Sequence, residues 1–149
     1  MIRKATETDA ASCSAILHEW IAETPWFPNH APESASEQSM LERIRAGRVI
    51  VLVSGDRING FAAYKGDYLD CLYLTPEARN KGYGKALLDE AKQNCPSGLA
   101  LWVLAQNERA VSFYTREGFS ITARGDGSDN EENLPDIRME WHPQEGTHG

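Results

Sequence analysis

The sequence predicts a layered α/β fold in which a mixed, mostly antiparallel sheet is flanked by about four helices. Runs of β-branched and other apolar residues recur along the chain, and segments with apolar residues at helical spacing separate several of them. Only Gly55 and Asp56 join the runs at 48–54 and 57–64, which is typical of an antiparallel hairpin. The 149 residues are 41% hydrophobic and 25% charged, as expected for one globular domain.

The first third of the chain is expected to form one short strand and two helices. Residues 2–5 fit a strand, and residues 6–9 offer side-chain oxygens that can cap a helix. One face of that helix carries Cys13, Ile16, Leu17, Trp20 and Ile21. It cannot extend through residues 23–30, because two prolines stand within four residues there. A second helix over about 34–46 should end at Gly47.

Three consecutive strands should form the middle of the sheet. The third of them, at 68–74, is apolar on both alternating faces apart from Asp70, so we expect it to be central. Pro76 then breaks the strand, and a helix follows with Ala86, Leu87, Leu88 and Ala91 on its apolar side.

The last third should alternate again between strands and a helix. The expected elements are a buried strand at 99–104, a helix from Asn107 to Gly118, and strands at 119–123 and about 135–141. An acidic loop at 125–134 lies between the last two. We expect residues 1–142 to form a single domain and residues 143–149 a flexible tail.

Charge and cysteine usage exclude several classes of protein. A net charge of −7 argues against a nucleic-acid partner, which would require a basic face. The first residues lack the apolar core of a signal peptide, and no run is long enough to cross a membrane. Three cysteines form no metal-binding spacing, and their odd number suits a reducing compartment. We therefore expect a cytoplasmic protein without membrane, nucleic-acid or metal partners.

The loop before the third helix is suited to binding an anion. Gly82 and Gly84 allow close approach of the backbone, and the first N–H groups of a helix lack intrahelical acceptors. Arg79, Lys81 and Lys85 add positive charge around the same loop. A pyrophosphate would fit such a site. The loop matches neither the three-glycine dinucleotide motif nor the P-loop.

Two motifs resemble those of the GNAT superfamily of acyl-CoA-dependent N-acetyltransferases. Arg79-x-x-Gly82-x-Gly84 is similar to the family's coenzyme A loop, and residues 107–119 are similar to its second motif of Asn, Ala, Phe-Tyr and Gly-Phe. The stretch 130–138 also resembles the ending of a group of bacterial members. The resemblance covers about residues 1–141 and implies the GNAT fold, with the strands at 68–74 and 99–104 splayed apart.

The same resemblance implies the site and the reaction. Acetyl-CoA would be the co-substrate, its pantetheine arm entering between the splayed strands, and a primary amine of a small molecule or peptide would attack the thioester directly. Tyr114 would lie beside the sulfur that leaves and could protonate it. The implied cofactor-binding residues are Leu72, Tyr73, Leu74, Arg79, Asn80, Lys81, Gly82, Tyr83, Gly84, Lys85, Asn107, Phe113 and Tyr114.

Several residues keep two interpretations. Asp70 could be a general base or an anchor for the amine, or it could have a structural role. Trp26 and Phe27 could line the acceptor pocket or pack beneath their loop. His18 and His30 are weaker candidates, and Cys71 fits a small buried residue better than a nucleophile.

Two questions about partners stay open at this level. A non-catalytic acyl-CoA-binding or interaction module is the alternative to an enzyme, and a homodimer is possible because dimers are common in the family. The acidic loop, which includes Asp126, Glu131 and Glu132, and the nearby Asp70 favour a cationic acceptor.

Overall fold

The computed structural model describes residues 1–27, 33–128, 130 and 133–143, except the side chains of residues 33–35. Its seven strands are β1 (Ile2–Lys4), β2 (Val49–Ser54), β3 (Arg57–Lys65), β4 (Tyr68–Leu74), β5 (Leu99–Leu104), β6 (Ser120–Gly125) and β7 (Asp136–Trp141). The helices are α1 (Ala10–Ala22), α2 (Glu33–Arg45), α3 (Tyr83–Asn94) and α4 (Glu108–Arg116), with 3-10 turns η1 (Glu7–Asp9) and η2 (Pro76–Ala78). The expected fold class and element order are confirmed.

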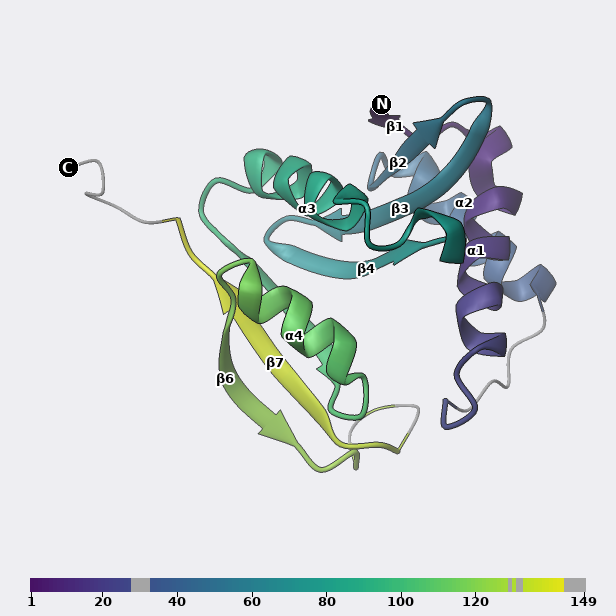
Figure 1. Cartoon of the computed structure of the whole chain (residues 1–149). Coiled ribbons are helices and arrows are strands. Elements are labelled where there is room, and N and C mark those ends of the chain that lie inside the picture. Colours follow the sequence, from purple (N-terminus) through teal and green to yellow (C-terminus); the bar gives the residue numbers. More distant parts are fainter. Residues whose placement is uncertain (28–32, 129, 131–132, 144–149) are drawn as a thin grey trace.

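All seven strands form one sheet in the order β1-β2-β3-β4-β5-β7-β6, with helices on both faces (Figure 1). In β2, Ile50 and Leu52 pack with the helices α3 and α4, while Val49 and Val51 pack with α1 and α2. Two apolar clusters are therefore buried on opposite faces of the same strand. This explains why β2 is apolar without alternation.

A β-bulge in β4 changes which side chains share a face. Ala63 pairs with Cys71 and Tyr64 pairs with Leu69, so Asp70 is an extra residue without a partner on β3. Leu72 packs with the α3–α4 cluster, whereas Asp70 meets arginines on the α2 side. Simple alternation along β4 would place Asp70 on the face of Leu72, and the bulge turns it to the opposite face.

Strands β4 and β5 are parallel and pair at one position only, Tyr68 with Ala100. The Ala100 N–H also donates to the Asp67 carbonyl at 2.8 Å. Beyond this point the strands separate, as expected from the resemblance. The sheet therefore opens at its centre, between the half that carries α3 and the half covered by α4 (Figure 1).

Some expectations concern residues outside the described part of the chain. They include His30, Glu131, Glu132 and the tail at 144–149. Within the described residues, no helix combines the length and the hydropathy needed to cross a membrane.

Candidate active site

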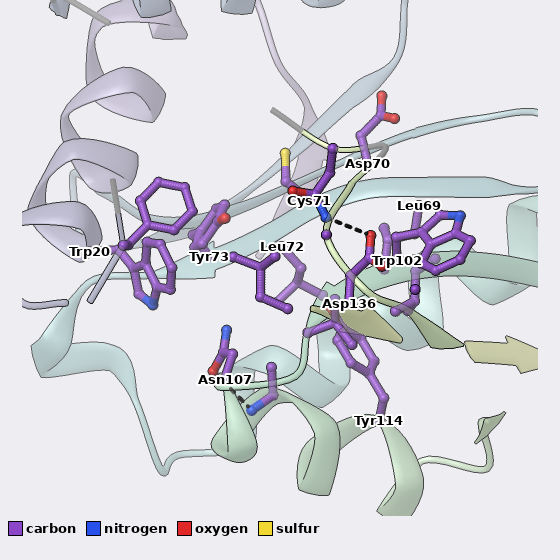
Figure 2. Close-up of a pocket in the computed structure, with 18 of the residues that line it drawn as sticks. Trp20, Leu69, Asp70, Cys71, Leu72, Tyr73, Trp102, Asn107, Tyr114 and Asp136 are labelled. Carbon is purple, nitrogen blue, oxygen red and sulfur yellow. Dashed lines mark hydrogen bonds between the residues drawn. The ribbon is translucent and has the colours of Figure 1, made fainter. Parts of the chain in front are cut away.

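A cavity of about 570 Å³ occupies the gap between β4 and β5 (Figure 2). Its walls come from β4, β5, α4, the end of α1 and the loop that joins β6 to β7. The lining residues are Trp20, Phe27, Leu69, Asp70, Cys71, Leu72, Tyr73, Leu101, Trp102, Val103, Leu104, Asn107, Ala110, Tyr114, Gly125, Asp126, Gly127, Asn130 and Asp136.

Tyr114 is the buried tyrosine of this cavity. Its ring extends from α4 toward the gap, and only 8% of the residue is exposed (Figure 2). Burial raises the pKa of its hydroxyl well above the ordinary value, with a smaller contribution from Cys71. The hydroxyl forms no hydrogen bond with any residue that the structure describes. It is therefore a neutral donor available to a group in the cavity.

Asn107 starts α4 and also reaches the cavity. Its side-chain oxygen accepts a hydrogen bond from the Ala110 N–H at 3.3 Å, so it is the N-cap of the helix. The amide nitrogen of the same side chain remains able to donate to a ligand. Figure 2 shows Asn107 between the start of α4 and the Trp20–Tyr73 side of the cavity.

The β4 backbone lines the cavity because the strand has lost its neighbour. On the side facing β5 it pairs only at Tyr68, and residues 71–73 border the cavity instead. Peptide groups here can bind an extended ligand as a strand would. Cys71 lies at the same place, and burial raises the pKa of its thiol to about 11, so it is a thiol at neutral pH.

The turn before α3 has a left-handed backbone at two of its residues. Gly82 has a φ of 84° and is the N-cap of α3, and Asn80 also has a positive φ of 64°. This backbone conformation explains Gly82, because no atom of the described residues lies within 4 Å of the place its Cβ would take. Gly84 differs, since a Cβ there would meet Phe113 Cζ at 3.5 Å and Leu74 Cδ1 at 3.6 Å. Tyr83 begins the helix and supplies one of its first free N–H groups.

The three cations expected at this turn differ in their ion-pair partners. Arg79 pairs with Glu23 at 2.8 Å and donates to the Leu74 carbonyl at 3.3 Å. Lys85 pairs with Asp89 at 2.9 Å. Lys81 is exposed and forms no ion pair with any described residue.

A second cavity of about 450 Å³ adjoins the first at Trp20 and Asn107. Arg79 and Glu23 line it together with Arg109 from the first turn of α4. Sequence reasoning missed Arg109, although its place two residues after the Asn107 cap was visible. This second cavity brings the α1 end, the turn before α3 and the start of α4 together.

Asp70 borders the cavity but is held by two arginines. Arg48 donates a hydrogen bond to its Oδ2, and Arg43 Nε lies 3.8 Å from the same oxygen. In Figure 2 the carboxylate points away from Trp20 and Tyr114. This geometry favours the structural interpretation of Asp70, because its oxygens already serve as acceptors for cations.

Aromatic residues from α1 and the following loop form the opposite wall. Trp20 lies 5.1 Å from Phe27 and 5.3 Å from Tyr73, measured between ring centroids. Phe27 lines the first cavity and Trp26 the second, so the two expected acceptor residues lie on adjoining cavities. Trp20 was expected only as a core residue, because its helical spacing says nothing about the cavity. His18 lines neither cavity.

Sequence reasoning singled out Asp126 of the acidic loop, which lines the first cavity, but it missed the other residues at the far end. Trp102, Asn130 and Asp136 meet there, and Trp102 is 41% exposed. The only available signal was the position of Trp102 between Leu101 and Val103, which turns it to the other face of its strand.

Comparisons with known proteins identify relatives of this domain. Residues 16–143 match the profile of the acetyltransferase (GNAT) domain. The chain is 30% identical over 129 residues to the peptidyl-lysine N-acetyltransferase YjaB of Salmonella typhimurium, covering 86% of this chain and 88% of that protein.

Solved structures share the fold. The solution structure of apo-form YjaB from Escherichia coli has a TM-score of 0.77 at 25% identity, covering 95% of this chain and 96% of that one. The PaiA N-acetyltransferase of Thermoplasma acidophilum, solved in complex with coenzyme A, has a TM-score of 0.76 at 22% identity, with 96% and 98% covered. At that identity the second likeness concerns the fold alone.

Proposed function

Since this chain belongs to the GNAT acetyltransferase family and is an acetyl-CoA-dependent N-acetyltransferase, we propose that its acceptor is the side-chain amine of lysine in a peptide or protein. The peptidyl-lysine N-acetyltransferases among its relatives support this acceptor class. The net charge of −7 also suits a cationic acceptor. The sequence left two classes open, an enzyme and a non-catalytic binding module. The family and its relatives favour the enzyme.

The residues around the gap suit the parts of acetyl-CoA. The turn at Arg79–Gly82 and the first N–H groups of α3 would bind the pyrophosphate, with Lys81 supplying a cation that has no partner among the described residues. The exposed edge of β4 would pair with the amides of the pantetheine arm. Asn107 would donate to the same arm while it caps α4. This arrangement leaves the thioester between β4 and Tyr114.

One observation carries the proposed chemistry, namely the buried, neutral Tyr114 hydroxyl that lines the gap between β4 and β5. The unprotonated lysine amine attacks the thioester carbonyl carbon, so a C–N bond forms and the C–S bond breaks. Backbone N–H groups of β4 stabilise the negative charge on the carbonyl oxygen. Tyr114 donates its proton to the departing sulfur and recovers one from water, which requires no covalent enzyme intermediate.

Asp70 has a supporting role in this scheme. Its contacts with Arg48 and Arg43 connect the bulge of β4 to the end of α2 and to the residue before β2. Residues 71–73, which follow the bulge directly, border the cavity. We therefore assign Asp70 to shaping β4, and the proton of the incoming amine leaves by water.

The acceptor is tested by thiol release from acetyl-CoA with three matched peptides. The first has a blocked N-terminus and one lysine, the second carries acetyl-lysine in its place, and the third has a free N-terminus and arginine. We expect turnover with the first alone, and an acetyl group on lysine by mass spectrometry. Turnover only with the third peptide, or only with free polyamines or amino acids, would exclude the proposed acceptor.

The domain bounds, the compartment and the oligomeric state are further proposals. We propose a single domain over residues 1–142 that works in the cytoplasm, as the free thiols of Cys13, Cys71 and Cys95 suit a reducing compartment. A homodimer remains a prediction, which the mass in solution at several protein concentrations would test.

A further inference from the structure

We propose that Asp136, at the start of β7, is the carboxylate that receives the ammonium group of the acceptor and so selects cationic substrates. It lies at the end of the first cavity, away from the Trp20 and Phe27 wall, together with Trp102 (Figure 2). The inference rests on the proposed lysine acceptor and adds the residue that recognises it.

The contacts of Asp136 orient it without neutralising it. Its Oδ2 accepts a hydrogen bond from Asn130 Nδ2 at 3.1 Å. The Asn130 side chain is itself fixed, because it donates to the Leu134 carbonyl at 2.7 Å and accepts from the Leu134 N–H at 3.2 Å. Among the described residues, Asp136 forms no salt bridge. The carboxylate therefore has no cationic partner among these residues and keeps an oxygen for a ligand.

Gly125 makes room for this carboxylate. The two residues are paired across β6 and β7, and a Cβ on Gly125 would lie 2.2 Å from Asp136 Oδ1. Any larger residue at 125 would force the carboxylate to move. Since no positive φ is needed at Gly125, the missing side chain is explained by the space that Asp136 uses.

Trp102 completes a surface that matches a lysine side chain. Its Cζ3 atom lies 3.8 Å from the place that a Cβ on Gly125 would take. The residue is 41% exposed and lines the cavity. An indole beside a carboxylate can cover the methylene stem of a lysine while the carboxylate binds the ammonium group. Of the other two carboxylates that line the cavity, Asp70 already faces two arginines. Asp126 is held by its own loop, because its Oδ1 accepts from the Ser128 N–H at 2.9 Å and from the Ser128 hydroxyl at 2.7 Å.

The first test compares Asp136→Asn with the wild type on the lysine peptide. The amide oxygen of the new side chain can still accept from Asn130, so the loop is kept. We expect KM for the peptide to rise about 10- to 100-fold, with kcat within about threefold and acetyl-CoA affinity unchanged. The matched control is Glu140→Gln, on the same face of β7, where the carboxylate pairs with Arg138 outside the cavity. An unchanged KM in Asp136→Asn would overturn the inference.

A second substrate separates recognition of charge from loss of structure. A peptide whose acceptor side chain ends in an aminooxy group is uncharged at neutral pH, so Asp136→Asn should use it as well as the wild type does. An equal loss on both peptides would overturn the ammonium role.

Gly125→Ala provides an independent variant, since it displaces the carboxylate without changing its chemistry. Gly125→Ala should raise KM for the lysine peptide. In the double variant with Asp136→Asn, KM should be close to that of Asp136→Asn alone. If the wild type acetylates another cationic amine in place of lysine, the proposed acceptor fails. The same variants then test Asp136 on that amine, so the two failures remain distinct.

Discussion

At the scale of single residues, Tyr114 shows how one side chain can belong to the core and to the site. Its ring lies 5.1 Å from the ring of Phe113 and 5.4 Å from that of Phe119, in edge contacts that any core aromatic could make. Only the hydroxyl distinguishes it. A change that removes this one atom therefore separates packing from chemistry.

The variant Tyr114→Phe keeps the ring and deletes the proton donor. Because a bond to a departing thiolate strengthens in the transition state, kcat should fall by roughly 10- to 10³-fold. Affinity for acetyl-CoA, measured by calorimetry, should stay close to the wild-type value. Full turnover in a folded Tyr114→Phe protein would assign protonation of the sulfur to solvent.

Gly82 requires a pair of variants, because its left-handed backbone penalises any side chain. Gly82→Asn and Gly82→Asp have nearly the same shape, and Asn tolerates this conformation. The aspartate should weaken acetyl-CoA binding by about tenfold or more beyond the asparagine, since it places a negative charge at the N-terminus of α3. Equal affinities in calorimetry would show that the pyrophosphate lies elsewhere.

At the scale of elements, the end of α1 is joined to the turn before α3 by Arg79 and Glu23. These residues are 56 positions apart, and the arginine is only 22% exposed in its side chain. No local pattern in the sequence predicts this pair. It places a carboxylate beside a cation that the proposed function assigns to phosphate.

The variant Glu23→Gln should therefore increase affinity for acetyl-CoA. A partly exposed ion pair contributes up to about 1 kcal/mol, so the gain should be about two- to fivefold. Glu77→Gln, in η2 of the same segment, is the control, because Glu77 is exposed and forms no ion pair with the described residues. If titration gives the same Kd for Glu23→Gln as for the wild type, Arg79 does not exchange its partner for phosphate.

Elements with strong local signals were predictable, and relations between elements were not. The strand at Tyr68–Leu74 follows from its run of apolar residues, and the start of α4 at Asn107 follows from side-chain chemistry. The bulge at Asp70 does not, because it depends on the register with β3. Trp102 and Asp136 meet only because β7 lies beside β5, and no neighbouring stretch of sequence records that order.

At the scale of the whole molecule, the buried thiols and Tyr114 make the free energy of unfolding decrease with pH in the alkaline range. Burial raises the pKa of Cys13 to about 12 from an ordinary value of 9.0, and it raises the pKa of Tyr114 as well. Below about pH 8 these groups are neutral in both folded and unfolded chains. Above it the unfolded chain loses protons that the folded chain keeps, so stability falls as pH rises toward 12.

Each such group contributes a slope of at most about 1.4 kcal/mol per pH unit. Urea unfolding at about pH 9 and about pH 11 should show the loss, and Cys13→Ala should reduce it by removing one fully buried titrating group. An identical pH dependence in Cys13→Ala and the wild type would contradict this account.

The single pairing of β4 with β5 has a consequence for the protein's lifetime in a cell. The sheet lacks one row of main-chain hydrogen bonds, and under the proposed arrangement the pantetheine arm supplies part of that row. The co-substrate is then a structural member of the sheet as well as a reactant. Because a ligand that binds only the folded state stabilises it by mass action, the fraction of folded enzyme rises and falls with the supply of acetyl-CoA. Degradation by proteases that attack the unfolded chain would then be fastest when the acetyl donor is scarce.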